Sequence, residues 1–71
     1  MRRAYRFASP WQVAEFFIAL GIFTRCDYGT AWNDSRLALV DCPTEQDQIH
    51  CDSFAKQSGG RLEDVDFSKK S

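Results

Sequence analysis

The sequence has few of the residues that mark the specialised classes of small protein. Its 71 residues include two prolines, four glycines and one histidine, a composition that is neither collagen-like nor typical of disordered segments. Its three cysteines are an odd number, which does not fit the paired disulfide framework of a small secreted domain. We therefore expect reduced thiols and a cytoplasmic protein.

A long hydrophobic run is also missing. The most apolar stretch, residues 13–23, is interrupted by Glu15 and is too short to cross a membrane. It follows the basic start Met1–Arg3, but Pro10 precedes it and no small-residue cleavage site comes after it, so we do not expect a signal peptide. The sequence predicts no membrane association.

Neither sign of charge dominates, since the formal net charge is −1. Residues 1–36 carry five Arg and three acids, a sum of +2, whereas residues 37–71 carry four basic residues and seven acids, a sum of −3. Nonspecific binding to nucleic acid draws its affinity mainly from neutralised phosphates, so this balance disfavours it. An alternative is a small nucleic-acid-binding subunit or adaptor that uses a folded basic patch. The arginines available for such a patch are Arg2, Arg3, Arg6, Arg25 and Arg36.

What the chain does have is apolar and aromatic side chains. Hydrophobic residues make up 44% of it and aromatic residues 14%, as in an ordinary globular protein. We predict a single compact α+β domain over residues 1–67, with residues 68–71 as a frayed tail. So short a chain buries only about 60% of its unfolded surface, which leaves little room for a catalytic cleft.

Two local patterns define the start of the fold. Residues 2–8 alternate, with Tyr5 and Phe7 on one side, as in a half-buried strand. Ser9 and Gln12 have the spacing of a capping box with a proline between them at the first helical position. The pattern predicts a helix from residue 10 to about residue 20, ended by Gly21.

This first helix has more apolar residues than one buried face needs. Val13, Phe17 and Leu20 form the predicted core stripe, with Phe16 beside them. Trp11 and Ile18 lie off that stripe. They either cover the edges of a small core or form an interface with a partner or with a second copy of the chain.

The rest of the chain predicts a hairpin, a helix and a last strand. Strands over about residues 22–32 and 36–41 would be joined by a turn at residues 33–34, and the second of them would be central in the sheet because it is apolar on both sides. A helix over residues 44–58 would follow Pro43, and Val65 and Phe67 would lie in a short fourth strand. The order β-α-β-β-α-β is the ferredoxin-like arrangement, a four-stranded antiparallel sheet with two helices on one face. The alternative is an α+β fold in which residues 44–58 form only a turn or loop.

The segment CPTEQDQIHC, residues 42–51, raises the question of a metal or redox site. No cysteine pair has zinc-ligand spacing, and His50 and Cys51 diverge by about 100° on a helix. Cys42 precedes a helix N-terminus, where its thiol pKa could fall, but no base is assigned to it. The segment also places Thr44 and Asp47 at N-cap spacing. We predict no metal, no cofactor and no catalytic residue.

Two sets of side chains are candidates for binding a partner. Seven acidic residues could form one negative surface on the second helix and the strand after it, able to enter a basic groove or to mimic nucleic-acid charge. Three aromatic residues outside the predicted core are of the types enriched in interface hot spots. The candidate partner-binding residues are Trp11, Tyr28, Trp32, Asp41, Glu45, Asp47, Asp52, Glu63, Asp64 and Asp66.

The sequence therefore predicts a small, non-enzymatic protein-binding module that occupies a surface of a larger protein or protein complex. In kind, though not in any motif, such a compact acidic domain is similar to the small inhibitors that phages encode against host immunity, including anti-CRISPR proteins. That similarity implies an inhibitor of a host complex. A homodimer formed through the first helix is a further expectation.

Overall fold

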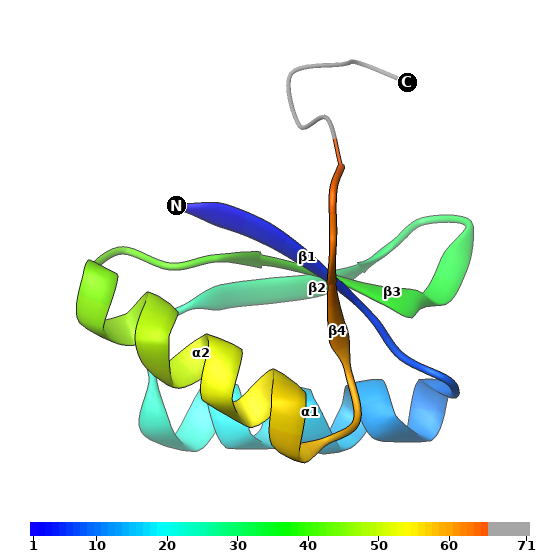
Figure 1. The fold of residues 1–71 in the computed structure, drawn as a ribbon, viewed down its shortest axis with the longest axis horizontal. Coiled ribbons are helices and arrows are strands. Elements are labelled where there is room, and N and C mark those ends of the chain that lie inside the picture. The colour runs from blue at the N-terminus through cyan, green and yellow to red at the C-terminus, as the bar shows by residue number, and fades with distance from the viewer. Residues whose placement is uncertain (66–71) are drawn as a thin grey trace.

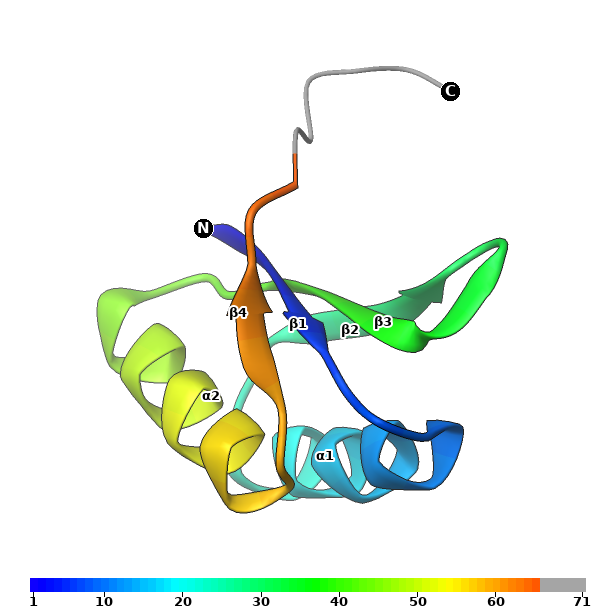
Figure 2. The ribbon, with the colours of Figure 1, turned by 45° about the vertical axis from the view of Figure 1, so that its right-hand side comes forward.

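The computed structural model describes residues 1–65, which form four strands and two helices in the order β-α-β-β-α-β (Figure 1). The predicted ferredoxin-like α+β fold is confirmed. Both helices lie on one side of the sheet (Figure 2). The elements are β1 (Arg2–Arg6), α1 (Pro10–Phe23), β2 (Asp27–Ala31), β3 (Asp34–Asp41), α2 (Glu45–Gln57) and β4 (Arg61–Glu63). No helix within residues 1–65 combines the length and the apolar character needed to cross a membrane.

The sheet is antiparallel, with strand order β2-β3-β1-β4. Strand β3 is central, as its two apolar sides predict. Tyr5 of β1 lies opposite Ala38 of β3 and Leu62 of β4, and because cross-strand partners share a face, all three point toward the helices. The open face therefore carries the alternate residues, including Arg6 and its partner Leu37.

Helix α1 begins as predicted and ends later than predicted. The Ser9 side chain accepts a hydrogen bond from the Gln12 backbone N–H, and the Gln12 side chain accepts one from the Ser9 N–H, which completes the capping box. The helix continues through Gly21 to Phe23 and is capped by Thr24. Gly21 is not a stop; a Cβ atom there would lie 3.0 Å from the Tyr28 hydroxyl, so the glycine allows close packing against β2.

The core lies between α1 and the sheet, and Phe16 is its centre. Phe16 is fully buried. Its ring centroid lies 5.5 Å from that of Tyr5 and 5.2 Å from that of Phe7. Phe17, predicted to be on the core stripe, is only half-buried and packs its ring on Tyr28 at 4.6 Å. Val13 and Leu20 are buried as predicted, and Phe16, expected beside the stripe, takes the central place that was predicted for Phe17.

The hairpin is shorter than predicted. Ile22 and Phe23 belong to α1, so β2 begins only at Asp27. The turn is at residues 32–33 rather than 33–34, because Asp34 already pairs with Ala31 across an irregularity in the register.

Helix α2 excludes the alternative fold in which residues 44–58 form a loop. Thr44 caps its N-terminus by accepting a hydrogen bond from the Asp47 N–H at 3.1 Å. Its buried face is thin and consists of Gln48, Cys51 and Ala55.

The fourth strand was predicted within the segment RLEDVDF, residues 61–67, and it occupies only the start of that segment. It occupies Arg61–Glu63, directly after Gly60, and pairs with β1 through Ala4, Tyr5 and Arg6. Asp64 and Val65 follow it outside the ladder. The expected strand residue Phe67 and the expected frayed tail, residues 68–71, lie outside the described residues.

The expectation of three reduced thiols is wrong. Cys26 and Cys42 form a disulfide, with their Cα atoms 4.3 Å apart, and Cys51 is the one free cysteine. The two paired cysteines flank the cross-strand pair Asp27–Asp41, so the sheet register brings them together. An odd cysteine count does not exclude one such pair, and the cytoplasmic location stays a prediction.

Candidate functional site

The outer face of α1, directed away from the sheet, is apolar and exposed. Trp11, Ile18 and Ile22 are spaced seven and four residues apart, which places them in one row on a helix, and their exposed fractions are 74%, 63% and 68%. Ala14 and Glu15 are exposed between them. We call the face formed by these five residues the α1 outer face. Since the solvent side of a surface helix is normally polar, this face is the most unusual surface of the described chain.

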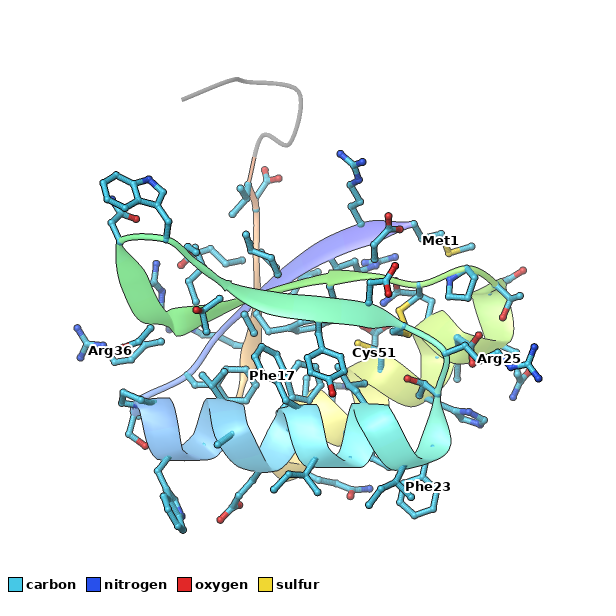
Figure 3. All side chains as sticks on the ribbon, turned by 180° about the vertical axis from the view of Figure 1, so that it is seen from behind. Met1, Phe17, Phe23, Arg25, Arg36 and Cys51 are labelled. Atoms are coloured by element: carbon cyan, nitrogen blue, oxygen red, sulfur yellow. A yellow bond between two sulfur atoms is a disulfide. The ribbon has the colours of Figure 1, made fainter. Side chains whose placement is uncertain are left out.

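Phe23 extends the apolar surface at the C-terminal end of α1. It is 64% exposed, and its ring lies 5.5 Å from that of Phe54 of α2. Figure 3 shows Phe23 pointing away from the sheet, whereas Phe17 lies between α1 and the sheet. The sequence prediction did not include Ile22 and Phe23 in this surface because it ended the helix too early. The four-residue step from Ile18 to Ile22 was the available signal.

The three predicted aromatic residues do not form one surface. Trp11 lies on the α1 outer face, while Trp32 is 88% exposed in the turn between β2 and β3, which projects from one end of the sheet (Figure 1). Tyr28 is 45% exposed and packs its ring on Phe17. Of the three, Trp11 alone belongs to the α1 outer face.

Most of the predicted acidic residues already have partners. Asp41 accepts a hydrogen bond from the N-terminal ammonium at 3.2 Å and lies 3.6 Å from Arg2. Asp47 accepts a hydrogen bond from the Thr44 hydroxyl at 3.1 Å at the start of α2. These carboxylates stabilise the chain terminus and a helix end.

Two further acids lie in separate environments. Glu63 is paired with Arg6 on the open face of the sheet. Asp52 of α2 accepts hydrogen bonds from Tyr5 of β1 and from Gln48 of the same helix. Glu45 and Asp64 are exposed, and Asp66 lies outside the described residues. The structure thus distributes the acids over several surfaces and does not place them on one.

Arg6 connects three strands on the open face. Its guanidinium donates to Glu63 of β4 at 3.0 and 2.8 Å and also to Asp34 of β3. Hydrogen bonds from Arg6 hold the pKa of each carboxyl below its ordinary value, and the backbone N–H of Arg36 contributes at Asp34. This cluster is a structural contact within the sheet.

The other predicted arginines do not gather into one patch. Arg2 is paired with Asp41, and Arg3 is half-buried on the helix-facing side. Arg25 and Arg36 lie at opposite ends of the molecule (Figure 3). Arg6 and Arg36 do line one hollow together with Arg61, but Arg2, Arg3 and Arg25 lie outside it.

The cysteine and histidine side chains do not come together in one site. Cys42 is joined to Cys26, so it carries no free thiol. Cys51 is fully buried, and burial raises the pKa of its thiol to about 11. His50 is exposed and lies 3.2 Å from the Gln46 amide. Within residues 1–65, no three His, Cys, Asp or Glu side chains are grouped as metal ligands.

The fold defines the class of this chain as a small ferredoxin-like α+β domain. Comparisons with models of known families, with curated proteins and with solved structures give no match.

Proposed function

We propose that the chain is a non-enzymatic protein-binding module that inserts the α1 outer face into an apolar groove of a larger protein. The observation that carries this proposal is the row formed by Trp11, Ile18 and Ile22, each more than 60% exposed on one face of one helix. Helices that bind in grooves use apolar anchors at such helical spacings. Tryptophan is also the residue type most enriched in binding hot spots.

The charge of α1 supports a protein groove as the binding surface. Between Pro10 and Phe23 the helix carries a single charged residue, Glu15, and no Lys or Arg. Helices that lie on membranes are usually rich in Lys and Arg on their polar face, so a lipid surface is disfavoured. A groove with an apolar floor and a basic residue at its rim complements this face.

The non-enzymatic part of the proposal is supported by the state of the reactive side chains. The Cys42 sulfur is in a disulfide and the Cys51 thiol is buried with a raised pKa, which makes both poor nucleophiles. Occupation of a partner's surface is also how a small inhibitor acts. A more specific form of this proposal is that the chain is a phage protein that inhibits a host immune complex.

Two matched substitutions, each of which replaces an exposed isoleucine by glutamate, test the proposal. Ile18→Glu places a carboxylate on the α1 outer face, and Ile49→Glu is its control, because Ile49 is also exposed, at 55%, on α2. We expect the wild type and the Ile49→Glu variant to capture the same protein from host lysate and Ile18→Glu to lose it. The purified partner should then bind Trp11→Ala at least tenfold more weakly, as for a hot spot.

Two outcomes would contradict the proposal. If all three proteins capture the same partners, the α1 outer face is not the binding surface. If light scattering shows a dimer that Ile18→Glu dissociates, a second copy of the chain occupies the face. The nucleic-acid alternative predicts instead a mobility shift of labelled duplex at low salt that Arg25→Gln and Arg36→Gln weaken.

A further inference from the structure

Strand β2 forms one edge of the sheet, and its outer side has no partner within residues 1–65. Among the described strands it pairs with β3 alone, and no further backbone hydrogen bond from residues 27–31 is formed within that range. Four of its five residues are exposed and the fifth is half-buried. Because an edge strand directs part of its N–H and C=O groups away from its neighbour, the outer side of β2 presents a row of free donors and acceptors.

The two edges of the sheet differ in their protection against pairing with another strand. Edge strands are commonly protected by shortness, charged side chains, proline or a bulge. The opposite edge, β4, has only three residues, and Arg61 and Glu63 are charged. Strand β2 is longer, contains neither proline nor lysine, and has Asp27 as its sole charged residue. Its pairing with β3 is regular up to Thr30, so the β2 edge has none of these protections over most of its length.

Gly29 lies at the centre of β2 and leaves space beside the strand. A Cβ atom there would meet nothing within 4 Å, and the φ of Gly29 is not positive. Neither the packing nor the backbone conformation of the described chain therefore requires a glycine at this position. Glycine inside a strand often marks a place where another backbone approaches closely.

The core is incompletely covered at the same edge. The ring of Tyr28 lies on the helix side of β2, with its centroid 4.6 Å from that of Phe17 in α1. Tyr28 is 45% exposed and Phe17 is half-buried, whereas Tyr5 in the interior of the sheet is only 2% exposed. Figure 3 shows β2 above α1, with Phe17 between them. A strand added beside β2 would cover this aromatic pair.

From these observations we propose that two copies of the chain pair through their β2 edges, antiparallel and centred on Gly29. A two-fold axis at this position joins identical edges, so that free donors of one copy meet free acceptors of the other. Tyr28 then lies opposite Thr30 of the second copy, an aromatic and β-branched pair of a favourable kind. Asp27 lies opposite Ala31 of the second copy, so the strands bring no two acids together.

This dimer leaves the α1 outer face free. The two sheets join side by side in one continuous sheet, whereas the α1 outer face is directed away from the sheet. A dimer of this kind would present two α1 outer faces, and two linked contacts bind more strongly than one where the partner offers two grooves. The β2 dimer goes beyond the proposed function and does not depend on it.

Light scattering and sedimentation velocity over a range of protein concentrations test the dimer. We expect a monomer–dimer equilibrium in the wild type. Gly29→Lys should raise the dimer Kd about tenfold or more, because it places two like charges directly opposite each other at the centre of the interface. The control is Leu62→Lys, which adds the same charge to an exposed position of β4 and should leave the dimer Kd unchanged.

A charge swap tests the register. Gly29→Glu alone should weaken the dimer as Gly29→Lys does, since it also sets like charges opposite each other. An equimolar mixture of the two variants should form a heterodimer, because lysine then faces glutamate. Both side chains extend into open space, and circular dichroism of each variant shows directly whether the fold is kept.

Several results would overturn the proposal. One is a wild type that stays monomeric at every concentration, as expected if the edge instead takes a strand of another protein. Others are a dimer that Gly29→Lys leaves intact and a mixture of the two charged variants that does not associate. Ile18→Glu separates this proposal from the proposed function, because that variant should lose the captured partner and keep the β2 dimer.

Discussion

The disulfide between Cys26 and Cys42 joins the residue directly before β2 to the residue directly after β3. Their Cα atoms are 4.3 Å apart, and they flank the pair Asp27–Asp41. The bond thus closes the end of the hairpin opposite its turn. It lies in the core, since Cys42 is fully buried and Cys26 is 6% exposed.

Loss of this disulfide should destabilise the fold. A cross-link between residues 16 positions apart restricts the unfolded chain and contributes about 3 kcal/mol in the loop-entropy model. We therefore expect Cys26→Ser combined with Cys42→Ser to lower the free energy of unfolding by about that amount in urea titrations. Reducing agent should have a similar effect on the wild type.

Thiol counting checks the same prediction directly. Unfolded protein without reductant should show one reactive thiol, that of Cys51. A Cys51→Ala variant should show none and keep its sensitivity to reducing agent. Three reactive thiols in the wild type would contradict the pairing.

Phe16 and Phe17 are adjacent aromatic residues with different expected contributions to stability. Phe16 is fully buried and packs on Tyr5 and Phe7, whereas Phe17 is half-buried at the edge, against Tyr28. Phe16→Ala should lower the free energy of unfolding by about 3–5 kcal/mol, and Phe17→Ala by clearly less. Thermal or urea unfolding measures both, and equal losses would contradict the observed difference in burial between the two rings.

The element order could be predicted because it depends on local signals. The capping box at Ser9 and Gln12 and the Thr44 cap each depend on residues three apart, so the sequence shows them directly. The C-terminal end of α1 was misplaced because Gly21, expected as a stop, lies inside the helix next to the Tyr28 hydroxyl of β2, seven residues away on another element. A glycine alone does not distinguish a helix stop from a close packing position.

The candidate sites were harder to predict for a similar reason. The α1 outer face could be recognised in part, since Trp11 and Ile18 lie off the core stripe in sequence. The acidic residues were predicted to share a surface, but whether Glu63 is free depends on its pairing with Arg6, 57 residues away.

The pairing of Arg6 with Glu63 and Asp34 predicts a loss of stability in acid. The pKa of each carboxyl is lowered in the folded chain by hydrogen bonds from Arg6. Their contribution is therefore complete above the unfolded pKa values of about 4 and is lost as the pH falls through the lower folded values. Glu63→Gln should make the decline in unfolding free energy below roughly pH 5 shallower.

A neighbouring acid provides the control for that measurement. Asp64 is exposed and forms no salt bridge with any of residues 1–65. Asp64→Asn should leave the acid slope as in the wild type. If Glu63→Gln also leaves it unchanged, the ion pair does not contribute to stability in solution.

Gly60 and Gly29 form a matched pair that tests the contact between the α2–β4 turn and the core. A Cβ atom on Gly60 would lie 2.5 Å from two carbons of the Phe7 ring, and Phe7 is 2% exposed, with little room to move. Gly60→Ala should therefore lower the free energy of unfolding by about 1–3 kcal/mol through overpacking. A Cβ atom on Gly29 meets nothing within 4 Å, so Gly29→Ala should be neutral or stabilising by less than about 1 kcal/mol. Urea unfolding compares the two, and a neutral Gly60→Ala would mean that the turn does not lie on Phe7.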